Sequence, residues 1–383
     1  MIYFDNNATT RIHPEVLAVI HRHLDETWGN PSSVHHPGRL ARRAIEEARE
    51  EIAALIGASP GEIVFTSGGT ESNNAAIFGR ALQHDPKRFH IVTTSIEHPA
   101  VQSVVLSLEE RGHPVTRVSP DRTGRVNPMR MIDAITETTG LVTMMLANNE
   151  TGVIQPVAEV SEACRDRAVP LHTDAVQAIG KLPVDVEILG VDSLSLSGHK
   201  FHGPKGIGVL YVRKGTVLAP FVLGGTQERR RRGGTENVPI AAGLGKAAQL
   251  ARESLHENIE RTREQRDRLE RQVLETIPRT SINGREAERL PNTSSISLEG
   301  CDSESLVIGL DLEGACVSAG SACSSGRVEP STVLVEMGLT PEQAKSTIRV
   351  SLCGTTTAEE VDRFVGLLSR VAAASREAGA VSI

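Results

Sequence analysis

The sequence predicts an α/β protein with a mainly parallel sheet in a large domain and a second, smaller α+β domain. Three observations indicate this fold class. The chain has 383 residues, more than a single domain usually has, so two domains are expected. Between about residues 60 and 215, strand-like runs alternate with amphipathic segments, which is typical of βαβ units. A long helical pattern then separates this region from the rest of the chain.

Four short runs rich in β-branched residues are the expected strands of the sheet. They are residues 63–66, 90–94, 140–145 and 169–173. Ligands of open parallel sheets bind at the carboxyl ends of the strands. Residues that directly follow these runs are therefore candidates for a functional site.

The second half of the chain begins with a long helical pattern. From Pro239 to about Thr276 the sequence is rich in Ala, Leu, Glu and Arg and has no glycine after Gly245, which predicts an extended helix between two domains. Beyond it, strands at 294–298 and 347–351 mix with helices near 303–312, 330–337 and 358–375. We predict a large domain of residues 13–250 and a small domain of residues 1–12 and 251–383.

Composition indicates an ordinary soluble protein. Apolar residues make up 39% and charged residues 23%, and the net charge is −7, which does not favour nucleic acid or anionic membranes. No apolar run approaches the roughly 20 residues that a membrane-spanning helix needs, and Asp5 interrupts any signal-peptide core. We therefore expect a cytoplasmic protein without nucleic-acid or membrane partners.

One basic run is an exception to this acidic composition. Residues 228–232 read Glu-Arg-Arg-Arg-Arg, a pattern that can mark a nucleic-acid patch. Because the protein is acidic and no aromatic residues interleave with the arginines, we interpret the run as a solvated segment.

The five cysteines do not form a disulfide or zinc pattern. Five is an odd number, and no two are spaced as Cys-x-x-Cys, so we expect neither a disulfide framework nor a metal site. Cys323 lies among Gly, Ser and Ala residues, which is typical of a loop that exposes a thiol. Cys164, Cys316 and Cys353 have helical or apolar surroundings and are interpreted as packed residues. Cys301, in a polar loop, is the rival for an exposed thiol.

A glycine-rich turn follows the first expected strand. Residues 67–73 (Ser-Gly-Gly-Thr-Glu-Ser-Asn) connect that strand to a helix, so backbone amides and hydroxyls there could cradle a phosphate. An ordinary strand–turn–helix connection is the alternative. The segment is not a Walker loop, because the Gly-Lys-Ser/Thr ending is absent.

Lys200 is the candidate for covalent chemistry. It lies among small residues at 197–206, directly after an apolar run, and an exposed turn lysine is the alternative interpretation. A Schiff-base lysine needs open surroundings for a cofactor ring, phosphate ligands such as Ser197 and His199, and a lowered pKa. This segment fits that description.

Asp174 ends another expected strand, where the ligand site of the sheet should lie. An aspartate in this position is usually a helix cap. If the ring of pyridoxal phosphate lies there, a carboxylate facing the pyridine nitrogen keeps that nitrogen protonated and makes the ring an electron sink.

Eight motifs, in order along the chain, resemble those of the IscS/NifS-type cysteine desulfurases. They lie at residues 5–10, 29–33, 66–73, 97–98, 148–150, 172–174, 197–200 and 320–323. The resemblance covers essentially the whole chain. It implies a fold-type-I pyridoxal-phosphate transferase of the class V aminotransferase family. The large domain then holds the cofactor on a mainly parallel seven-stranded sheet flanked by helices, and the small domain carries the sulfur-acceptor loop.

The resemblance also implies roles for individual residues. The enzyme would convert L-cysteine to L-alanine and leave a persulfide on Cys323, Lys200 would hold the cofactor as a Schiff base, and His98 would stack on the ring and move protons. Asp174 would face the pyridine nitrogen, and Gln177 would donate to the ring phenolate oxygen. The other implied cofactor contacts are Gly69, Thr70, Asn149, Ser197, His199 and Thr235.

Substrate and subunit contacts follow from the same resemblance. Arg349 would bind the substrate carboxylate, helped by Asn30 and with Asn149 nearby, because a planar guanidinium binds a carboxylate bidentately. Thr235 would reach the phosphate of the partner subunit, which requires a homodimer. The sulfur would pass to an iron–sulfur scaffold or another sulfur-acceptor protein, such as one for transfer-RNA thiolation.

One feature departs from the family pattern, and other classes of protein are kept as alternatives. Cys353-Gly354 stands where related sequences commonly have glycine and a basic or polar residue, which suggests a second thiol near the site. Other enzymes of this fold type, such as an aminotransferase or a selenocysteine lyase, and a non-catalytic scaffold are the alternatives. The cysteine loop argues against an aminotransferase, and the filled catalytic positions argue against a scaffold.

Overall fold

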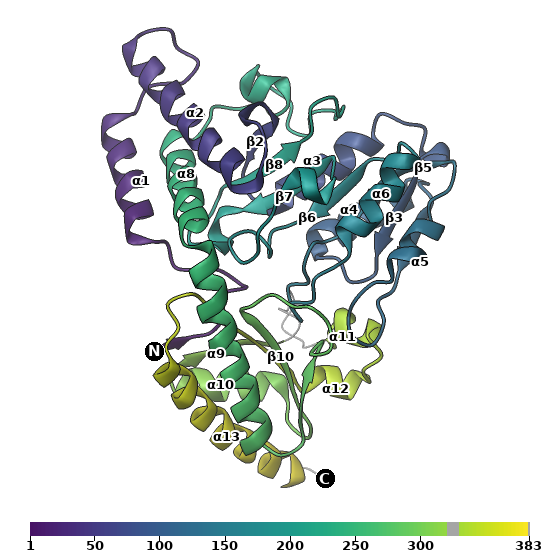
Figure 1. Cartoon of the computed structure of the whole chain (residues 1–383), viewed down its shortest axis with the longest axis vertical. Helices are drawn as coiled ribbons and strands as arrows, with labels where there is room; N and C mark the ends of the chain where they lie inside the picture. The colour runs from purple at the N-terminus through teal and green to yellow at the C-terminus, as the bar shows by residue number, and fades with distance from the viewer. Residues whose placement is uncertain (320–328, 382–383) are drawn as a thin grey trace.

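The computed structural model describes residues 1–319 and 329–381, and it forms two bodies joined by two consecutive helices (Figure 1). The larger body, in the upper part of the figure, contains the strands of the first half of the chain. The smaller body contains the N-terminal residues together with the last third of the chain. Among the helices of the described residues, none combines the length and apolar character needed to cross a membrane.

Seven strands form the sheet of the larger body in the order β2-β8-β7-β6-β5-β3-β4. They are β2 (Ile63–Thr66), β3 (His90–Thr94), β4 (Val115–Val118), β5 (Thr139–Thr143), β6 (Leu171–Asp174), β7 (Ser193–Ser197) and β8 (Gly208–Val212). All neighbours are parallel except β8, which is antiparallel to β2 and β7. The predicted mainly parallel, seven-stranded sheet is confirmed.

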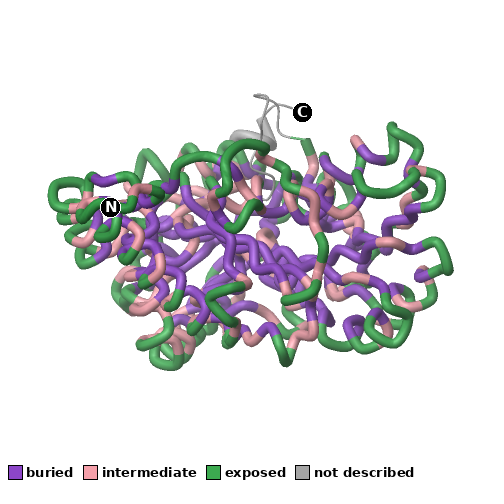
Figure 2. Tube along the Cα trace, turned by 90° about the horizontal axis from the view of Figure 1, so that it is seen from above, coloured by how far each residue is buried: buried purple, intermediate pink, exposed green. Residues whose placement is uncertain are grey.

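Helices cover this sheet and bury its central strands. Every residue of β3, β6 and β7 is buried, as expected for parallel strands with both faces covered. The buried residues run through the middle of the molecule in Figure 2. The helices of the larger body are α1 (Pro14–Glu26), α2 (His36–Ile56), α3 (Gly69–Ala81), α4 (Pro99–Glu110), α5 (Pro128–Asp133), α6 (Val157–Asp166), α7 (Val186–Leu189) and α8 (Val238–Glu253).

Helices α2 and α8 pack closely because of one glycine. Helix α2 buries Ala41, Ile45, Ala48 and Ile52, which are spaced three or four residues apart and so form one apolar face. A Cβ atom on Gly245 of α8 would lie 2.6 Å from the Cα atom of Ala48. Only glycine therefore permits this approach of the two backbones.

The predicted extended helix after Pro239 is two helices. Helix α8 ends at Glu253, and α9 (Leu255–Thr276) begins after Ser254. The Ser254 hydroxyl donates to the Leu250 carbonyl oxygen at 2.8 Å, and the Asn258 side chain donates to that hydroxyl at 2.8 Å. A serine that bonds back to the carbonyl four residues earlier can bend a helix, which accounts for the break.

The smaller body combines antiparallel strands with helices. Its four-stranded sheet has the order β12-β13-β10-β9, and β1 pairs in parallel with β11. The strands are β1 (Ile2–Tyr3), β9 (Thr280–Asn283), β10 (Thr293–Leu298), β11 (Ala315–Cys316), β12 (Ser318–Ala319) and β13 (Thr347–Ser351). The helices beside α9 are α10 (Ser303–Leu312), α11 (Thr332–Glu336), α12 (Pro341–Lys345) and α13 (Ala358–Val381). A separate apolar core includes Phe4, Leu269, Ile348 and Phe364.

The run 228–232 is not a simply solvated segment, contrary to its interpretation from sequence. Glu228 lies in the short helix η4 (Gln227–Arg230) and is buried. Its two carboxylate oxygens each accept from Arg49 of α2 at 2.8 Å, and one also accepts from the Phe65 backbone amide at 3.0 Å. Positive φ angles at Glu228, Arg229 and Arg230 turn the chain inward to reach this partner. The other short helices are η1 (Pro60–Glu62), η2 (Pro86–Arg88) and η3 (Gly198–Lys200).

Candidate active site

A cavity of about 240 Å³ lies where β6 and β7 end and α3 begins. The structure thus brings together residues from many parts of the chain at the edge of the sheet where ligands are expected. The predicted cofactor residues that line the cavity are Gly69, Thr70, His98, Asn149, Asp174, Gln177, Ser197, His199 and Lys200. Asn73, Ala100, Met145, Ala147 and Val176 complete the lining.

The Lys200 amine lies in a desolvated environment. It follows β7 in η3, and its Nζ atom donates to the carbonyl oxygens of Asn7 at 2.6 Å and Ala8 at 2.8 Å. Burial is the main cause that lowers the pKa of Lys200 to about 8, and the Arg349 guanidinium lowers it further. A larger fraction of this amine is therefore neutral, and so nucleophilic, than of an exposed lysine.

Asp174 presents its carboxylate at the end of β6. One oxygen accepts from the Val176 backbone amide at 2.9 Å, and the other accepts from the Asn73 side chain at 2.6 Å. The second contact is short and buried, which is typical of a hydrogen bond to an ionised group. Asn73 therefore orients the carboxylate toward the cavity, a contact that the sequence analysis did not predict.

The N-terminus of α3 forms one wall of the cavity. The first amides of a helix have no acceptor within the helix and attract anions. A Cβ atom on Gly69 would lie 2.7 Å from a methyl carbon of Val176 and 3.5 Å from the Cβ atom of Ser197. Only glycine leaves this cradle open, which explains the residue type at that position.

His98 presents an N–H group to the cavity. It caps α4, and its Nδ1 atom accepts from the Ala100 backbone amide at 3.1 Å. In the neutral ring the proton therefore lies on Nε2. Burial lowers the pKa of His98, although the Asp174 carboxylate opposes this effect. The geometry favours a proton donor over a base on the cavity side of the ring.

Glu97 is a buried acid directly before His98. Its Oε1 atom accepts from the Thr94 hydroxyl at 2.7 Å and from the Met145 amide at 2.8 Å. Burial raises the pKa of Glu97 to about 8. The side chain is thus held rigidly between β3 and the loop after β5, where it fixes the position of His98.

Arg349 lies on β13 of the smaller body and is buried. Its Nη1 atom donates to the Asn149 carbonyl oxygen at 3.1 Å, and its Nη2 atom donates to Asp5 at 2.9 Å. The Nε atom is buried and has no hydrogen-bond partner among the described residues. A buried, unsatisfied donor on a guanidinium indicates a site where a further acceptor can bind.

Two predicted site residues of the described part of the chain are exposed and lie outside this arrangement. Asn30 is exposed, does not line the cavity, and accepts from the Ser32 backbone amide at 2.9 Å. Thr235 is exposed and is likewise absent from the cavity lining. Cys323 lies outside the described residues.

The other thiols differ from their interpretation in three cases, those of Cys301, Cys316 and Cys353. Cys301 is 9% exposed and lies 3.5 Å from the Ala372 carbonyl oxygen, so it is wrong as an exposed rival to Cys323. Cys316 is half-buried instead of packed, because β11 is a two-residue strand beside β1. Cys164 is buried, as expected, and Cys353 is half-buried.

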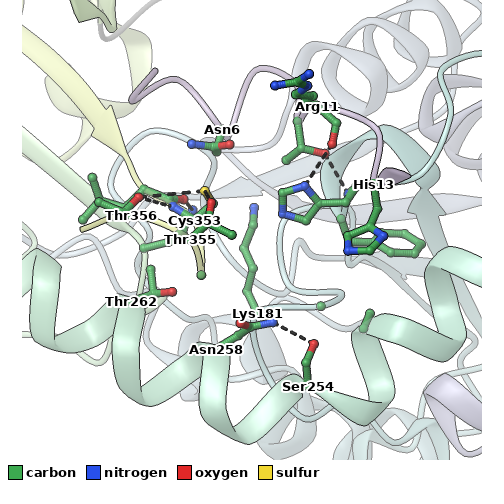
Figure 3. A pocket seen from close by; sticks show the side chains of 18 of the residues that line it. Asn6, Arg11, His13, Lys181, Ser254, Asn258, Thr262, Cys353, Thr355 and Thr356 are labelled. Carbon is green, nitrogen blue, oxygen red and sulfur yellow. Dashed lines mark hydrogen bonds between the residues drawn. The ribbon is translucent and has the colours of Figure 1, made fainter. Parts of the chain in front are cut away.

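Cys353 belongs to a second, larger cavity between the two bodies. This cavity of about 820 Å³ is lined by the N-terminal segment, the junction of α8 and α9, and residues 352–356. Lys181, Lys200 and Cys353 are among its lining residues. Lys200 therefore lies between the two cavities (Figure 3 shows the larger one).

The fold and the smaller cavity define an enzyme in which a half-buried lysine and a carboxylate meet the N-terminus of a helix, which suits an anion. The family model "Aminotransferase class-V" matches residues 2–364. A cysteine desulfurase IscS of Dictyoglomus turgidum is 46% identical over 370 residues, which cover 97% of this chain and 94% of that protein. The chain belongs to the class-V aminotransferase family, and within it to the IscS/NifS-type cysteine desulfurases.

Solved structures agree with this placement. A NifS-like protein has a TM-score of 0.91 at 39% identity, covering 97% of this chain and 99% of that one. The structure "SspA in complex with cysteine" has a TM-score of 0.83 at 35% identity, covering 93% of this chain and all of the other. The resemblance recognised in the sequence motifs is therefore confirmed.

Proposed function

We propose that this protein uses pyridoxal phosphate to convert L-cysteine to L-alanine and transfers the sulfur to Cys323 as a persulfide. The observation that carries the proposal is the convergence of Lys200, Asp174 and the N-terminus of α3 on one cavity. The family relationship and the cysteine complex of a structural relative support the same substrate.

The residues of the cavity fit pyridoxal phosphate. The open cradle at Gly69, with Thr70, Ser197 and His199 beside it, suits a phosphate at a helix N-terminus. Burial lowers the pKa of His199 to about 4, so this ring binds as a neutral group. When bound, the cofactor supplies an electron sink that stabilises negative charge at the substrate α-carbon.

Asp174 and Lys200 supply the remaining contacts of the cofactor. The Asp174 carboxylate, oriented by Asn73, would hold a proton on the pyridine nitrogen. The Lys200 amine would bind the cofactor covalently, leave it when the substrate amine arrives, and then accept the α-proton. An amine of lowered pKa suits both tasks, because it is a nucleophile and a base near neutral pH.

Arg349 and His98 would act on the substrate. The substrate carboxylate would bind the Arg349 guanidinium and satisfy the buried Nε atom that has no partner among the described residues. His98 would donate its Nε2 proton within the cavity. These contacts orient the amino acid so that its sulfur faces the sulfur acceptor.

Sulfur transfer would break one bond and form another. The Cys323 thiolate attacks the substrate sulfur, a sulfur–sulfur bond forms, and the carbon–sulfur bond breaks with its electron pair left on carbon. Protonation of that carbon then gives alanine. The persulfide would pass its terminal sulfur to an acceptor protein, for iron–sulfur cluster assembly or transfer-RNA thiolation in the cytoplasm.

A homodimer would complete the site. Thr235 is exposed on the larger body and does not line the cavity of its own subunit, so its predicted phosphate contact requires a second copy. Light scattering should find a dimer, and Thr235→Ala should weaken cofactor binding without unfolding the chain. A fully active monomer saturated with cofactor would contradict this part of the proposal.

The proposal is tested by trapping the cofactor. Borohydride reduction of the loaded protein, followed by peptide mapping, should label Lys200, and Lys200→Ala should remove the label but leave the fold intact. Exposed Lys205 is the internal control. Cysteine together with a thiol reductant, but without a keto-acid acceptor, should yield sulfide and alanine in equal amounts, because the reductant releases the persulfide sulfur as sulfide. A label on Lys181 or Lys205, or a need for a keto acid, would refute the assignment.

A further inference from the structure

Lys181 is a charged residue of the interdomain cavity that the proposed reaction does not use. It follows Gly180, whose φ angle is +74° and whose Cβ atom, if present, would lie 2.7 Å from the Cβ atom of Phe201. Only glycine allows this turn to pack directly against the segment that carries Lys200. Figure 3 shows the Lys181 side chain extended in the cavity, between Asn258 of α9 and Asn6 of the N-terminal segment.

The Lys181 amine contacts neutral oxygen atoms. It donates to the side-chain oxygen of Gln177 at 2.7 Å and to that of Asn7 at 3.2 Å. No ion pair links Lys181 to a carboxylate within residues 1–319 and 329–381. Burial lowers the pKa of Lys181 well below its ordinary value, and the Lys200 charge acts in the same direction. Desolvation of a lysine amine without a carboxylate partner is unfavourable, so a specific role is expected for this residue.

Two contacts determine the orientation of the Gln177 amide, one with Lys181 and one with the Asn7 carbonyl oxygen, which can only accept. A lysine amine in its charged form only donates, so it must face the Oε1 atom of the amide and not Nε2. The Nε2 atom then donates one hydrogen to the Asn7 carbonyl oxygen at 3.0 Å. Its second hydrogen stays available to the smaller cavity, which Gln177 also lines.

The same lysine stabilises the acceptors of Lys200. Asn7 receives Lys181 on its side-chain oxygen and Lys200 on its backbone oxygen. The Asn292 side chain donates to the same side-chain oxygen at 2.9 Å, and the Asn7 amide nitrogen donates to Thr293 at 2.8 Å. Residues of both bodies therefore form hydrogen bonds with Asn7, and Lys181 is one of these partners.

We propose that Lys181 is a positioning residue of the cofactor site, which turns the Gln177 amide so that an N–H group faces the ring oxygen of the cofactor. This inference rests on the proposed function, because it requires pyridoxal phosphate in the smaller cavity. A hydrogen-bond donor at that oxygen stabilises the negative charge of the oxygen. It therefore lowers the pKa of the neighbouring Lys200 nitrogen.

The proposal predicts a shift in the pH at which the bound cofactor changes its visible absorbance. That pH reports loss of the proton from the Lys200 nitrogen once it is joined to the cofactor. The charged and titratable groups around this nitrogen are Asp5, His98, Asp174, His199 and Arg349, from five different segments. All remain in a Lys181 variant, so the difference from the wild type isolates Lys181.

The experiment compares variants by absorbance titration without cysteine. Lys181→Met should raise the midpoint by about 1 pH unit, because a Gln177 amide that lacks the Lys181 contact donates less well to the ring oxygen, and a less stabilised oxygen favours the protonated nitrogen. Lys181→Arg, which keeps the charge and the donors, should restore at least half of the shift. Lys214→Met, at an exposed lysine after β8, is the matched control and should leave the midpoint unchanged.

A double variant tests whether Lys181 acts through Gln177. In a Gln177→Leu background, Lys181→Met should cause a clearly smaller shift than in the wild type. An unchanged midpoint in folded Lys181→Met, or an equal shift in both backgrounds, would overturn the positioning role. If Lys181→Met does not fold, Lys181→Ala, which has neither the donor nor the charge, should show the upward shift, and an unchanged midpoint would again refute the idea. A wild-type protein without any cofactor absorbance would instead refute the proposed function.

Discussion

The reactivity of the Lys200 amine should depend on pH differently from that of an exposed lysine such as Lys214. Burial and the Arg349 guanidinium lower the pKa of Lys200 from 10.5 to about 8. At pH 7 an amine of pKa 8 is about 10% neutral, whereas one of pKa 10.5 is about 0.03% neutral. Lys200 should thus have about 300 times more reactive amine at neutral pH, before any difference in access is considered.

Competitive labelling measures this pKa directly. The cofactor-free protein is treated with acetic anhydride over a range of pH, and peptide mass spectrometry follows the labelling of each lysine. Lys200 should titrate near pH 8, well below the pH range of an ordinary lysine side chain. Since desolvation is the largest cause of the shift, most of it should persist in variants of the neighbouring charges.

Two variants should move the Lys200 titration in opposite directions. Arg349→Met removes a repelling cation and should raise the midpoint, whereas Asp174→Asn removes an attracting anion and should lower it. Each shift should be about half to one pH unit, because partly screened charges act on a group whose shift is mainly due to burial. A wild-type midpoint near 10.5, or shifts of the opposite sign, would refute the reasoning.

Three further predictions concern the buried Glu97, the thiols and an ion pair of the larger body. Since burial raises the pKa of Glu97 from 4.5 to about 8, its contribution to stability is complete below pH 4.5 and is lost as the pH rises toward 8. In urea unfolding at several pH values, the free energy of unfolding of the wild type should fall by up to about 1.4 kcal/mol per pH unit in this range because of Glu97. Glu97→Gln should remove this fall. Cys323→Ala should abolish sulfide and persulfide formation but keep cofactor and cysteine binding. Cys353→Ala should leave turnover largely intact. Mass spectrometry after cysteine treatment locates the added sulfur. Glu228→Ala should lower the free energy of unfolding by about 3–5 kcal/mol, because Arg49 is left buried without its partner.

Each of these predictions can fail in a distinct way. An equal pH dependence of stability in wild type and Glu97→Gln would show that Glu97 does not titrate in this range. Near-normal alanine production by Cys323→Ala, with loss in Cys353→Ala, would reassign the sulfur acceptor. An unfolding midpoint of Glu228→Ala close to that of the wild type would show that the buried pair contributes little.

The sequence was sufficient for four of the seven strands of the sheet and for the segments that supply the cavity. Strands such as β3 and β5 are short runs that contain β-branched residues, so their local composition predicts them. Lys200 and Asp174 could be named because each lies at or just after the end of a strand-like run, where a parallel sheet places its ligands. The sequence could have suggested that Asn73 lies near the cavity, because Asn73 lies four residues after Gly69 and so on the same side of one helix.

Local patterns misjudged residues whose burial depends on distant segments. Cys301 has polar neighbours in sequence, yet α13 covers its thiol. Glu228 belongs to a charged run, yet Arg49 from α2 draws it into the interior. In both cases the covering element lies more than 70 positions away along the chain, where composition and periodicity give no information.

The sequence by itself therefore determined which residue types are present, which runs form strands and helices, and which motifs relate the chain to its family. Only the tertiary structure decided that Asn73 orients Asp174 across 101 positions and that Lys181 reaches Asn7 across 174 positions. Propensity and periodicity arise from interactions between near neighbours in the chain. The orientation of a buried amide or carboxylate depends instead on which donors the packing of strands and of the two bodies brings within 3 Å of it.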